Sequence, residues 1–400
     1  MGNYSNWIRI LLTLFVFLPL PGWSEDESER ILRVDDTAFY FSPGNWVGDA
    51  GRGGRAYRQA WNAGAYFRVS WESTNASSAI TLLLDTHTYP DGFKPPRVVC
   101  NIDGRWSEPF HPHEEEVVLT GPESPGRHVL TGYLASSTQD QRWGSEGVSG
   151  VNVLRIKGVR LSAGSQPSPA VVGKKWALIV GDSLTEGVGV KELEGWSSLV
   201  GQGLQELAFE YGISACGWSG WQIRGDQPPG DVPAYYKVTG SVAGAGGTYL
   251  DAESRWNKID ANHALLDSEG HLSGHGTRGQ EPALVLINYG TNDILHNANV
   301  SDVEAGIALY LEDLRRAAPR AHIVFIIPFG RYKAEEIYRV VKAYQATHPS
   351  DQGVAVIDLG PAVSHGLAAG GFWGGLHPNA RGHATFAARI MARIASMPGL

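Results

Sequence analysis

Short runs in which apolar and polar residues alternate follow one another along the first part of the chain, and this pattern predicts β-strands. The runs recur at close spacing from Ile31 to Leu161: "RVDDTAFYF", "AYFRVSWES", "AITLLLD", "RVVCNI", "EEVVLT", "HVLTGYLAS" and "VNVLRIKGVRLS". Gly, Pro, Asn and Asp lie between them, and no long helical period interrupts the series. Short strands with turn residues between them predict an all-β sandwich, jelly-roll-like, over residues 25–163.

The pattern changes after a segment rich in small residues and proline. "GSQPSPAVVGKK" predicts a linker over residues 164–174. Beyond it, buried-strand runs alternate with stretches of helical period; the strand runs are "WALIVGD", "ALVLINYG", "AHIVFIIPFG" and "VAVIDLG". This order predicts a three-layer α/β/α domain over residues 175–400, with a parallel sheet covered by helices on both faces.

Local signals predict three further details of this second domain. "WSSLVGQGLQELAFEYG" has the spacing of a helix that ends at Gly212. Ser301 and Glu304 form the pattern of a capping box at the start of a later helix. Residues 225–281 interrupt the rhythm with glycine and proline, so we expect an ordered insertion there, with a helix within "ESRWNKIDANHALL".

Residues 1–24 have the features of a secretory signal peptide. Arg9 supplies a positive charge, Ile10–Leu20 is mostly apolar, and Gly22 and Ser24 are small residues suited to cleavage. The apolar run is too short for a good transmembrane helix. We therefore expect a secreted or periplasmic protein, with an uncleaved interfacial anchor as the alternative.

Composition and charge restrict the kind of partner that the protein can bind more than they restrict its fold. Charged residues make up 18% of the 400 residues, the formal net charge is -8, and no cluster of Lys and Arg offsets it. This balance argues against nucleic acid or an anionic membrane as the main partner. The two cysteines, Cys100 and Cys216, leave one disulfide or two buried thiols equally open.

Ser183 is the strongest candidate for chemistry, because "IVGDSLTEGVG" places it where a predicted strand turns into a helix. Backbone N–H groups at such a junction point toward incoming negative charge. A serine nucleophile also needs a base and donors for the oxyanion. His377 in "GGLHPN" is a candidate base, Gly220 in "CGWSG" would let the backbone approach a substrate oxygen, and Asn292 in "NYGTND" carries an amide donor.

These candidates follow the ends of predicted parallel strands, so we expect them to meet at one rim of the sheet. Helix capping is the alternative role for Asn292. Asp182 is expected to brace the turn beside the serine, and His383, which starts the last helix, is expected to be structural.

The four segments "GDSLTEG", "GWSG", "GTND" and "GLHPN", in this order, resemble the SGNH hydrolase superfamily of GDSL-type esterases and lipases. The resemblance runs from about Lys174 to the end of the chain. It implies that Ser183 is the nucleophile and His377 the general base. It also implies an oxyanion hole made of the N–H groups of Ser183 and Gly220 and the amide of Asn292, with no cofactor. The Gly-x-Ser-x-Gly pattern of the α/β-hydrolases is absent.

The chain departs from this family beside the histidine. The family usually places an aspartate three residues before it, where this chain has Gly374. A sandwich ahead of such a domain is similar to carbohydrate esterase family 2, whose members deacetylate plant polysaccharides, some with a Ser-His dyad held by a main-chain carbonyl. The resemblance implies an acetylated carbohydrate substrate and a carbonyl from around Phe372 to Gly374. A carboxylate from elsewhere, such as Asp358 or one in the insertion, is the alternative.

Aromatic residues near these segments suggest how a sugar would bind. Trp196, Trp218, Trp221, Tyr289 and Trp373 all lie in or near them. Because aromatic rings stack on sugar faces, we expect Trp221, Trp373 and Tyr289 to bind substrate, with core packing as the alternative. "HPHEEE" (residues 111–116) holds two histidines and three glutamates, but such a charge run is usually a solvated face, and we expect no metal site.

Two other functions fit the same sequence. One keeps the chemistry but changes the substrate to a lipid, phospholipid or thioester. The other, motivated by the missing aspartate, is a carbohydrate-binding protein whose hydrolase domain is inactive.

Overall fold

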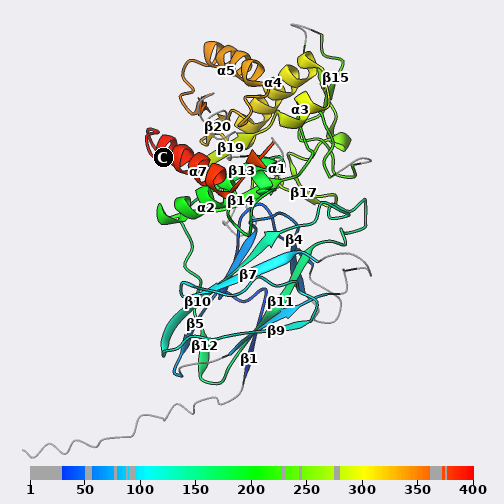
Figure 1. Cartoon of the computed structure of the whole chain (residues 1–400). Helices are drawn as coiled ribbons and strands as arrows, with labels where there is room; N and C mark the ends of the chain where they lie inside the picture. The colour runs from blue at the N-terminus through cyan, green and yellow to red at the C-terminus, as the bar shows by residue number, and fades with distance from the viewer. Residues whose placement is uncertain are drawn as a thin grey trace, which may run out of the picture.

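The computed structural model describes residues 29–49, 56–75, 79–86, 89, 95–226, 230–242, 246–273, 280–360, 372–373 and 376–400. The signal peptide predicted for residues 1–24, and Gly374, lie outside these residues. The described chain forms a β-sandwich followed by an α/β region (Figure 1). None of its helices combines the length and the apolar character needed to cross a bilayer.

The sandwich consists of two antiparallel sheets, as predicted. The first contains β3 (Val47–Asp49), β4 (Tyr57–Ala60), β11 (Leu154–Leu161), β6 (Ile80–Leu84) and β9 (Glu116–Leu119), with β1 (Arg30–Arg33) beside β11. The second contains β12 (Ser165–Pro167), β5 (Tyr66–Ser73), β10 (Gly126–Ser136), β7 (Arg97–Ile102) and β8 (Arg105–Trp106), with β2 (Phe39–Phe41) beside β5. Buried side chains such as Trp71, Leu82, Leu130 and Ile156 form its core. Strand β12 lies within the segment predicted as a linker.

The second region is built on a parallel sheet, which confirms the predicted α/β/α class. Its strand order is β14 (Phe209–Ala215), β13 (Lys175–Gly181), β19 (Leu284–Asn288), β20 (His322–Ile326) and β21 (Val354–Ile357). Successive side chains of a strand point to opposite faces, so Ala177 and Ile179 enter one core while Leu178 and Val180 enter the other. This two-sided burial explains why "WALIVG" is continuously apolar.

Helices cover both faces of this sheet (Figure 1). One face carries α2 (Trp196–Glu206) and α7 (Ala380–Ile394), and the other carries α4 (Val300–Ala317) and α5 (Ala334–Thr347). Two short helices, α1 (Ser183–Glu186) and α3 (Thr291–Leu295), follow the carboxyl ends of β13 and β19. The elements that carry the candidate residues therefore leave the sheet at one end.

Two of the local predictions for this region are wrong. The helix expected to reach Gly212 ends at Glu206, and Phe209–Ala215 is strand β14 instead. Ala208 turns the chain with φ +60°, and every residue of β14 is buried, so pairing with β13 outweighs local helical spacing. The cap of α4 is Asn299, whose side chain accepts backbone N–H groups, rather than the predicted Ser301.

The predicted insertion contains short elements in place of the expected helix. They are β15 (Val238–Thr239), β16 (Thr248–Tyr249), the 3-10 helix η1 (Asp251–Glu253), β17 (Lys258–Asp260) and β18 (His263–Ala264). Apolar residues of this stretch, among them Ile259 and Leu265, pack into the core that lies under α4.

Candidate active site

Three neighbouring strands end level with one another, which places the candidate segments side by side. Gly181, the last residue of β13, pairs with Ala215 of β14 and with Asn288 of β19. A side chain at position 181 would collide with that of Thr185, so this glycine lets α1 fold back closely on its strand. The residues that follow all three strands therefore share one rim of the sheet.

Ser183 and His377 meet at this rim, although 194 positions separate them in the chain. The Nε2 atom of His377 lies 2.9 Å from the Ser183 hydroxyl oxygen, and both residues are half-buried. His377 belongs to β23 (His377–Pro378), which pairs with β22 (Phe372–Trp373), so that Trp373 stands opposite it. Burial lowers the pKa of His377 below its ordinary value, which keeps the imidazole neutral and able to accept a proton at neutral pH.

No carboxylate among the described residues forms an ion pair or hydrogen bond with His377. The alternative carboxylate, Asp358, is occupied elsewhere: it pairs with Arg331 and accepts hydrogen bonds from the Tyr338 hydroxyl at 3.0 Å and the Gly360 N–H at 2.7 Å. Burial alone shifts the pKa of His377. The main-chain acceptor expected near Gly374 stays a prediction, because that residue lies outside the described part.

Asp182 caps the serine-bearing helix, the bracing role expected of it. Its Oδ1 atom accepts the N–H of Leu184 at 2.9 Å. The side chain is fully buried, and burial raises its pKa to about 7.

Gly220 is a glycine for a different reason than expected. A Cβ at this position would lie 2.6 Å from an oxygen of Asp293, whose carboxylate accepts the N–H groups of Trp221 and Gln222, each at 2.9 Å. The neighbouring carboxylate, rather than the approach of a substrate, thus excludes a side chain here. The Gly220 N–H itself donates to the Ile223 carbonyl at 2.9 Å. It would have to share or leave that bond to face an oxyanion.

Asn292 points its amide at the same loop. Its Nδ2 atom donates to the Ser219 carbonyl at 2.9 Å, and a second N–H of the amide remains for another acceptor. It is not a helix cap, because Gly290 occupies the N-cap of α3 and makes no side-chain cap bond. Among the described residues none accepts the backbone N–H of Ser183.

Two of the three aromatic residues predicted to bind substrate are core residues instead. Trp221 and Tyr289 are 0% and 1% exposed, and their rings pack together 5.7 Å apart in the core beneath the rim. The side chain of Trp373 lies outside the described residues. Trp218 was not among the residues predicted to bind substrate, yet it is 37% exposed. It has φ +63°, and its ring packs 5.6 Å from that of His296. Spacing alone could not tell which tryptophan of this loop faces outward.

The remaining polar candidates have structural surroundings. His383 is buried, its Nδ1 accepts the Trp196 N–H at 3.0 Å, and burial lowers its pKa to about 4. Cys100 and Cys216 are buried free thiols. Within the described ranges no group of three or more metal-ligating side chains gathers, and the Nδ1 atom of His111 lies 2.8 Å from the Pro95 carbonyl oxygen.

Residues 179–385, more than half of the chain, match the GDSL-like lipase/acylhydrolase family. The chain belongs to this family. Membership agrees with the resemblance inferred from the four sequence segments and makes the protein a GDSL-type acylhydrolase. No curated protein matches the sequence.

Solved structures of similar fold include the sandwich as well as the GDSL-type region. A family two carbohydrate esterase from Clostridium thermocellum in complex with cellohexaose has 13% identity and a TM-score of 0.60, over 89% of this chain and 98% of that one. An acetyl xylan esterase from the rumen bacterium Butyrivibrio proteoclasticus has 13% identity and a TM-score of 0.61, over 92% and 97%. A salicylyl-acyltransferase from a tetracycline biosynthetic pathway has 15% identity and a TM-score of 0.57, over 92% and 98%. At these identities the likeness establishes the fold.

Proposed function

We propose that this GDSL-type acylhydrolase is an exported serine esterase that removes acetyl or other short acyl groups from polysaccharide or oligosaccharide. The observation that carries the proposal is the 2.9 Å contact between His377 Nε2 and the Ser183 hydroxyl. A nucleophile and a neutral base within hydrogen-bond reach are the two groups that acyl transfer requires.

The reaction proceeds through an acyl-enzyme. Ser183 Oγ attacks the acyl carbonyl carbon while His377 Nε2 takes the hydroxyl proton. The tetrahedral intermediate collapses as the bond to the sugar oxygen breaks, and His377 returns the proton to that oxygen. Water then attacks the acyl-enzyme with His377 again as base, releasing the carboxylic acid and restoring Ser183.

Three donors are assigned to the oxyanion of this intermediate: the N–H of Ser183, the N–H of Gly220 and the amide of Asn292. No residue in the described part of the chain accepts the second N–H of this amide, whose first N–H is given to Ser219. When substrate binds, the Gly220 N–H is shared between the Ile223 carbonyl and the oxyanion. In many catalytic sites the hydrogen bonds to the reacting atoms become short only in the complex with substrate.

The carbohydrate assignment has two supports. It draws on the fold shared with family two carbohydrate esterases, one of them a complex with cellohexaose, and on the exposed ring of Trp218 at the rim. Indole rings stack on sugar faces while their N–H groups meet hydroxyls. Export rests on the signal features of residues 1–24. It predicts that protein recovered outside the cytoplasm begins after this segment, as its intact mass would show.

The test compares wild type with Ser183→Ala on acetylated xylan, on 4-nitrophenyl acetate and on a long-chain nitrophenyl ester. We expect wild type to release acetate from the first two and Ser183→Ala to lose at least about 1,000-fold in kcat. A preference for the long-chain ester would favour the lipid alternative. A wild type inert on every ester but retained on polysaccharide would favour the inactive binding protein.

A further inference from the structure

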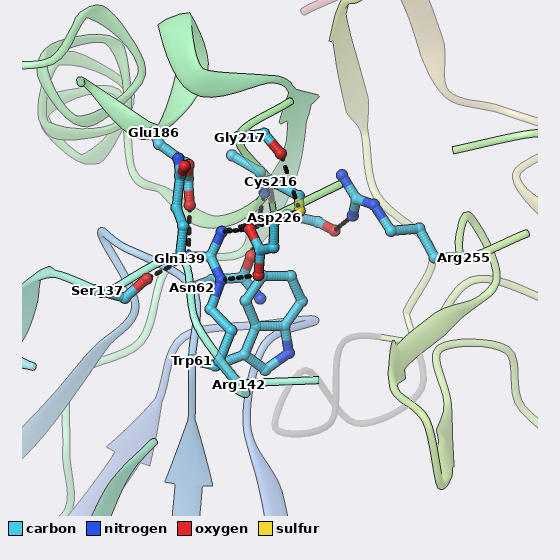
Figure 2. A network of polar contacts seen from close by, with 12 residues as sticks. Trp61, Asn62, Ser137, Gln139, Arg142, Glu186, Cys216, Gly217, Asp226 and Arg255 are labelled. Carbon is cyan, nitrogen blue, oxygen red and sulfur yellow. Dashed lines mark hydrogen bonds and ion pairs between the residues drawn. The ribbon is translucent and has the colours of Figure 1, made fainter. Parts of the chain in front are cut away.

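A loop of the sandwich reaches the rim of the hydrolase sheet and places one arginine there (Figure 2). The loop spans residues 137–153, between β10 and β11, and the Arg142 side chain is 0% exposed. Its Nε and Nη2 atoms contact the two carboxylate oxygens of Asp226 at 2.7 and 2.6 Å. Its Nη1 atom contacts Glu186 at 2.5 Å and donates to the Ser137 hydroxyl. The guanidinium lies 4.9 Å from the centre of the Trp61 ring.

The two carboxylates belong to the two elements that carry candidate catalytic groups. Glu186 is the last residue of α1, which begins at Ser183. Asp226 closes the loop that contains Gly220: its N–H donates to the Gly217 carbonyl at 2.9 Å, and the Cys216 thiol donates to its carboxylate at 3.3 Å. One guanidinium from the sandwich therefore joins the serine helix to the Gly220 loop.

Gln139, on the same sandwich loop, makes a second link. Its amide donates to the other oxygen of Glu186 at 2.6 Å. A Cβ at Gly217 would collide with this amide, so the absence of a side chain there admits Gln139 to the loop. The sandwich thus holds both elements at once, with directed bonds.

The side chains of this cluster are almost completely buried. Asp226 and Glu186 are 0% and 5% exposed. Arg255, also fully buried, lies beside this cluster, but it donates to the Ser214 hydroxyl at 3.1 Å and to the Tyr289 hydroxyl rather than to either carboxylate. Buried carboxylates stay charged only beside a counter-ion, and the planar fork of arginine fixes their orientation as well as their charge.

We propose that Arg142 of the sandwich is a positioning residue for the Ser183 centre, holding α1 and the Gly220 loop in the relative placement that acyl transfer requires. This inference rests on the proposed function of the same site. Displacements of about 1 Å in an active site can lower a rate by about 100-fold. The accessory sandwich would then be part of the catalytic apparatus.

A second, partly buried ion pair between the same two regions provides the control. Arg68 of β5 binds Glu210 of β14 through two contacts of 2.8 and 2.7 Å. Glu210 lies five residues before the end of β14, about 16 Å from the rim at the rise of a β-strand. Arg68→Met removes a bidentate pair of the same kind without touching α1 or the Gly220 loop.

The experiment compares Arg142→Met, Arg142→Lys and Arg68→Met with wild type. For each, Ser183 is titrated with a nitrophenyl phosphonate, and its phosphonylation rate, kcat per titrated serine, KM for 4-nitrophenyl acetate and Tm are measured. We expect both methionine variants to lower Tm. Only Arg142→Met lowers kcat and the phosphonylation rate, each by about 100-fold with KM little changed. Arg142→Lys recovers part of the loss, since it restores charge without the fork.

Equal kcat and phosphonylation rate in Arg142→Met and Arg68→Met, assayed well below Tm, would overturn the proposal and leave a structural role alone. If Arg142→Met does not fold, Glu186→Gln decides the question, because it keeps the side-chain shape and removes the charge that Arg142 binds on α1. It should lower the same two rates. A wild type that is phosphonylated but hydrolyses no ester would count against the proposed function. The phosphonylation rates would still test Arg142.

Discussion

The sandwich contacts the hydrolase region through an arginine bound to a carboxylate near the start of strand β14 and again beyond its end. The two ion pairs differ in the elements that carry their carboxylates. At the start of the strand, Arg68 binds Glu210, which also accepts the Gly173 N–H at 2.8 Å and the Tyr66 hydroxyl. Beyond its end, Arg142 binds two carboxylates on separate elements that lead to Ser183 and Gly220. A buried ion pair can thus join two domains or arrange a site, depending on which elements its carboxylates belong to.

Substitutions of two glycines, one in the loop after β14 and one within β14, should distinguish an effect on the active site from an effect on domain packing most strongly. Gly220→Ala would press a methyl group against the Asp293 carboxylate, which holds two backbone N–H groups of the loop. We expect a loss of about 100-fold or more in kcat, because an oxyanion donor moves.

Gly212→Ala would press against the Pro43 carbonyl of the sandwich instead. We expect it to lower the free energy of unfolding by about 2 kcal/mol while kcat changes little.

Both variants would be followed by steady-state kinetics on 4-nitrophenyl acetate and by urea unfolding. A Gly212→Ala enzyme that loses as much kcat as Gly220→Ala would show that the whole strand, rather than its end, transmits the sandwich's influence.

Trp218 is exposed on the same loop whose neighbouring residue Gly217 lies against Gln139 of the sandwich. Trp218→Ala removes an exposed ring that packs on His296 and touches neither ion cluster. We expect KM for acetylated xylan to rise about tenfold, in keeping with one lost stacking contact, with KM for 4-nitrophenyl acetate unchanged. Isothermal titration of xylo-oligosaccharide into the Ser183→Ala protein, with and without Trp218→Ala, would measure the change in binding affinity directly. Equal effects on both substrates would argue against a sugar platform.

The pH dependence is the smallest effect and should be the same in wild type and Arg68→Met. His377 must be neutral to accept the serine proton, and burial lowers its pKa below the ordinary 6.5. As pH falls, kcat/KM should therefore drop with a one-proton slope whose midpoint lies below 6.5. A midpoint above 6.5 would indicate an anion beside the imidazole and favour a carboxylate triad over the dyad.

The pattern of apolar and polar residues was enough to predict the class of both regions, because alternation indicated the sandwich and apolar runs between helical stretches indicated the parallel sheet. Strand β13 was predicted instead from a continuous apolar run, because a strand buried on both faces must be apolar throughout. The pattern did not work for Phe209–Ala215, where an apparent helix continued through the residues of β14, because spacing does not reveal which strand will pair alongside. The helix expected in the insertion was wrong for a similar reason, since those residues form the short strands β17 and β18 and Ile259 and Leu265 pack into a core shared with distant segments.

The candidate site divides in the same way. Motif order was sufficient to name Ser183 and His377, which the structure brings together. It did not separate Trp218 from Trp221, three residues apart, one exposed and one buried. It also gave no sign of Arg142, because nothing around an arginine in a loop of the sandwich indicates that its partners lie 44 and 84 positions away, at Glu186 and Asp226.

The sequence by itself determined the two regions, their layer types and the family, because these depend on local periodicity and on short motifs that each contain their own information. Only the tertiary structure decided which ring faces outward, what crowds Gly220 and which charges meet at the rim. Those properties depend on contacts between segments distant in the chain, and burial is a property of the assembled molecule rather than of any one stretch of it.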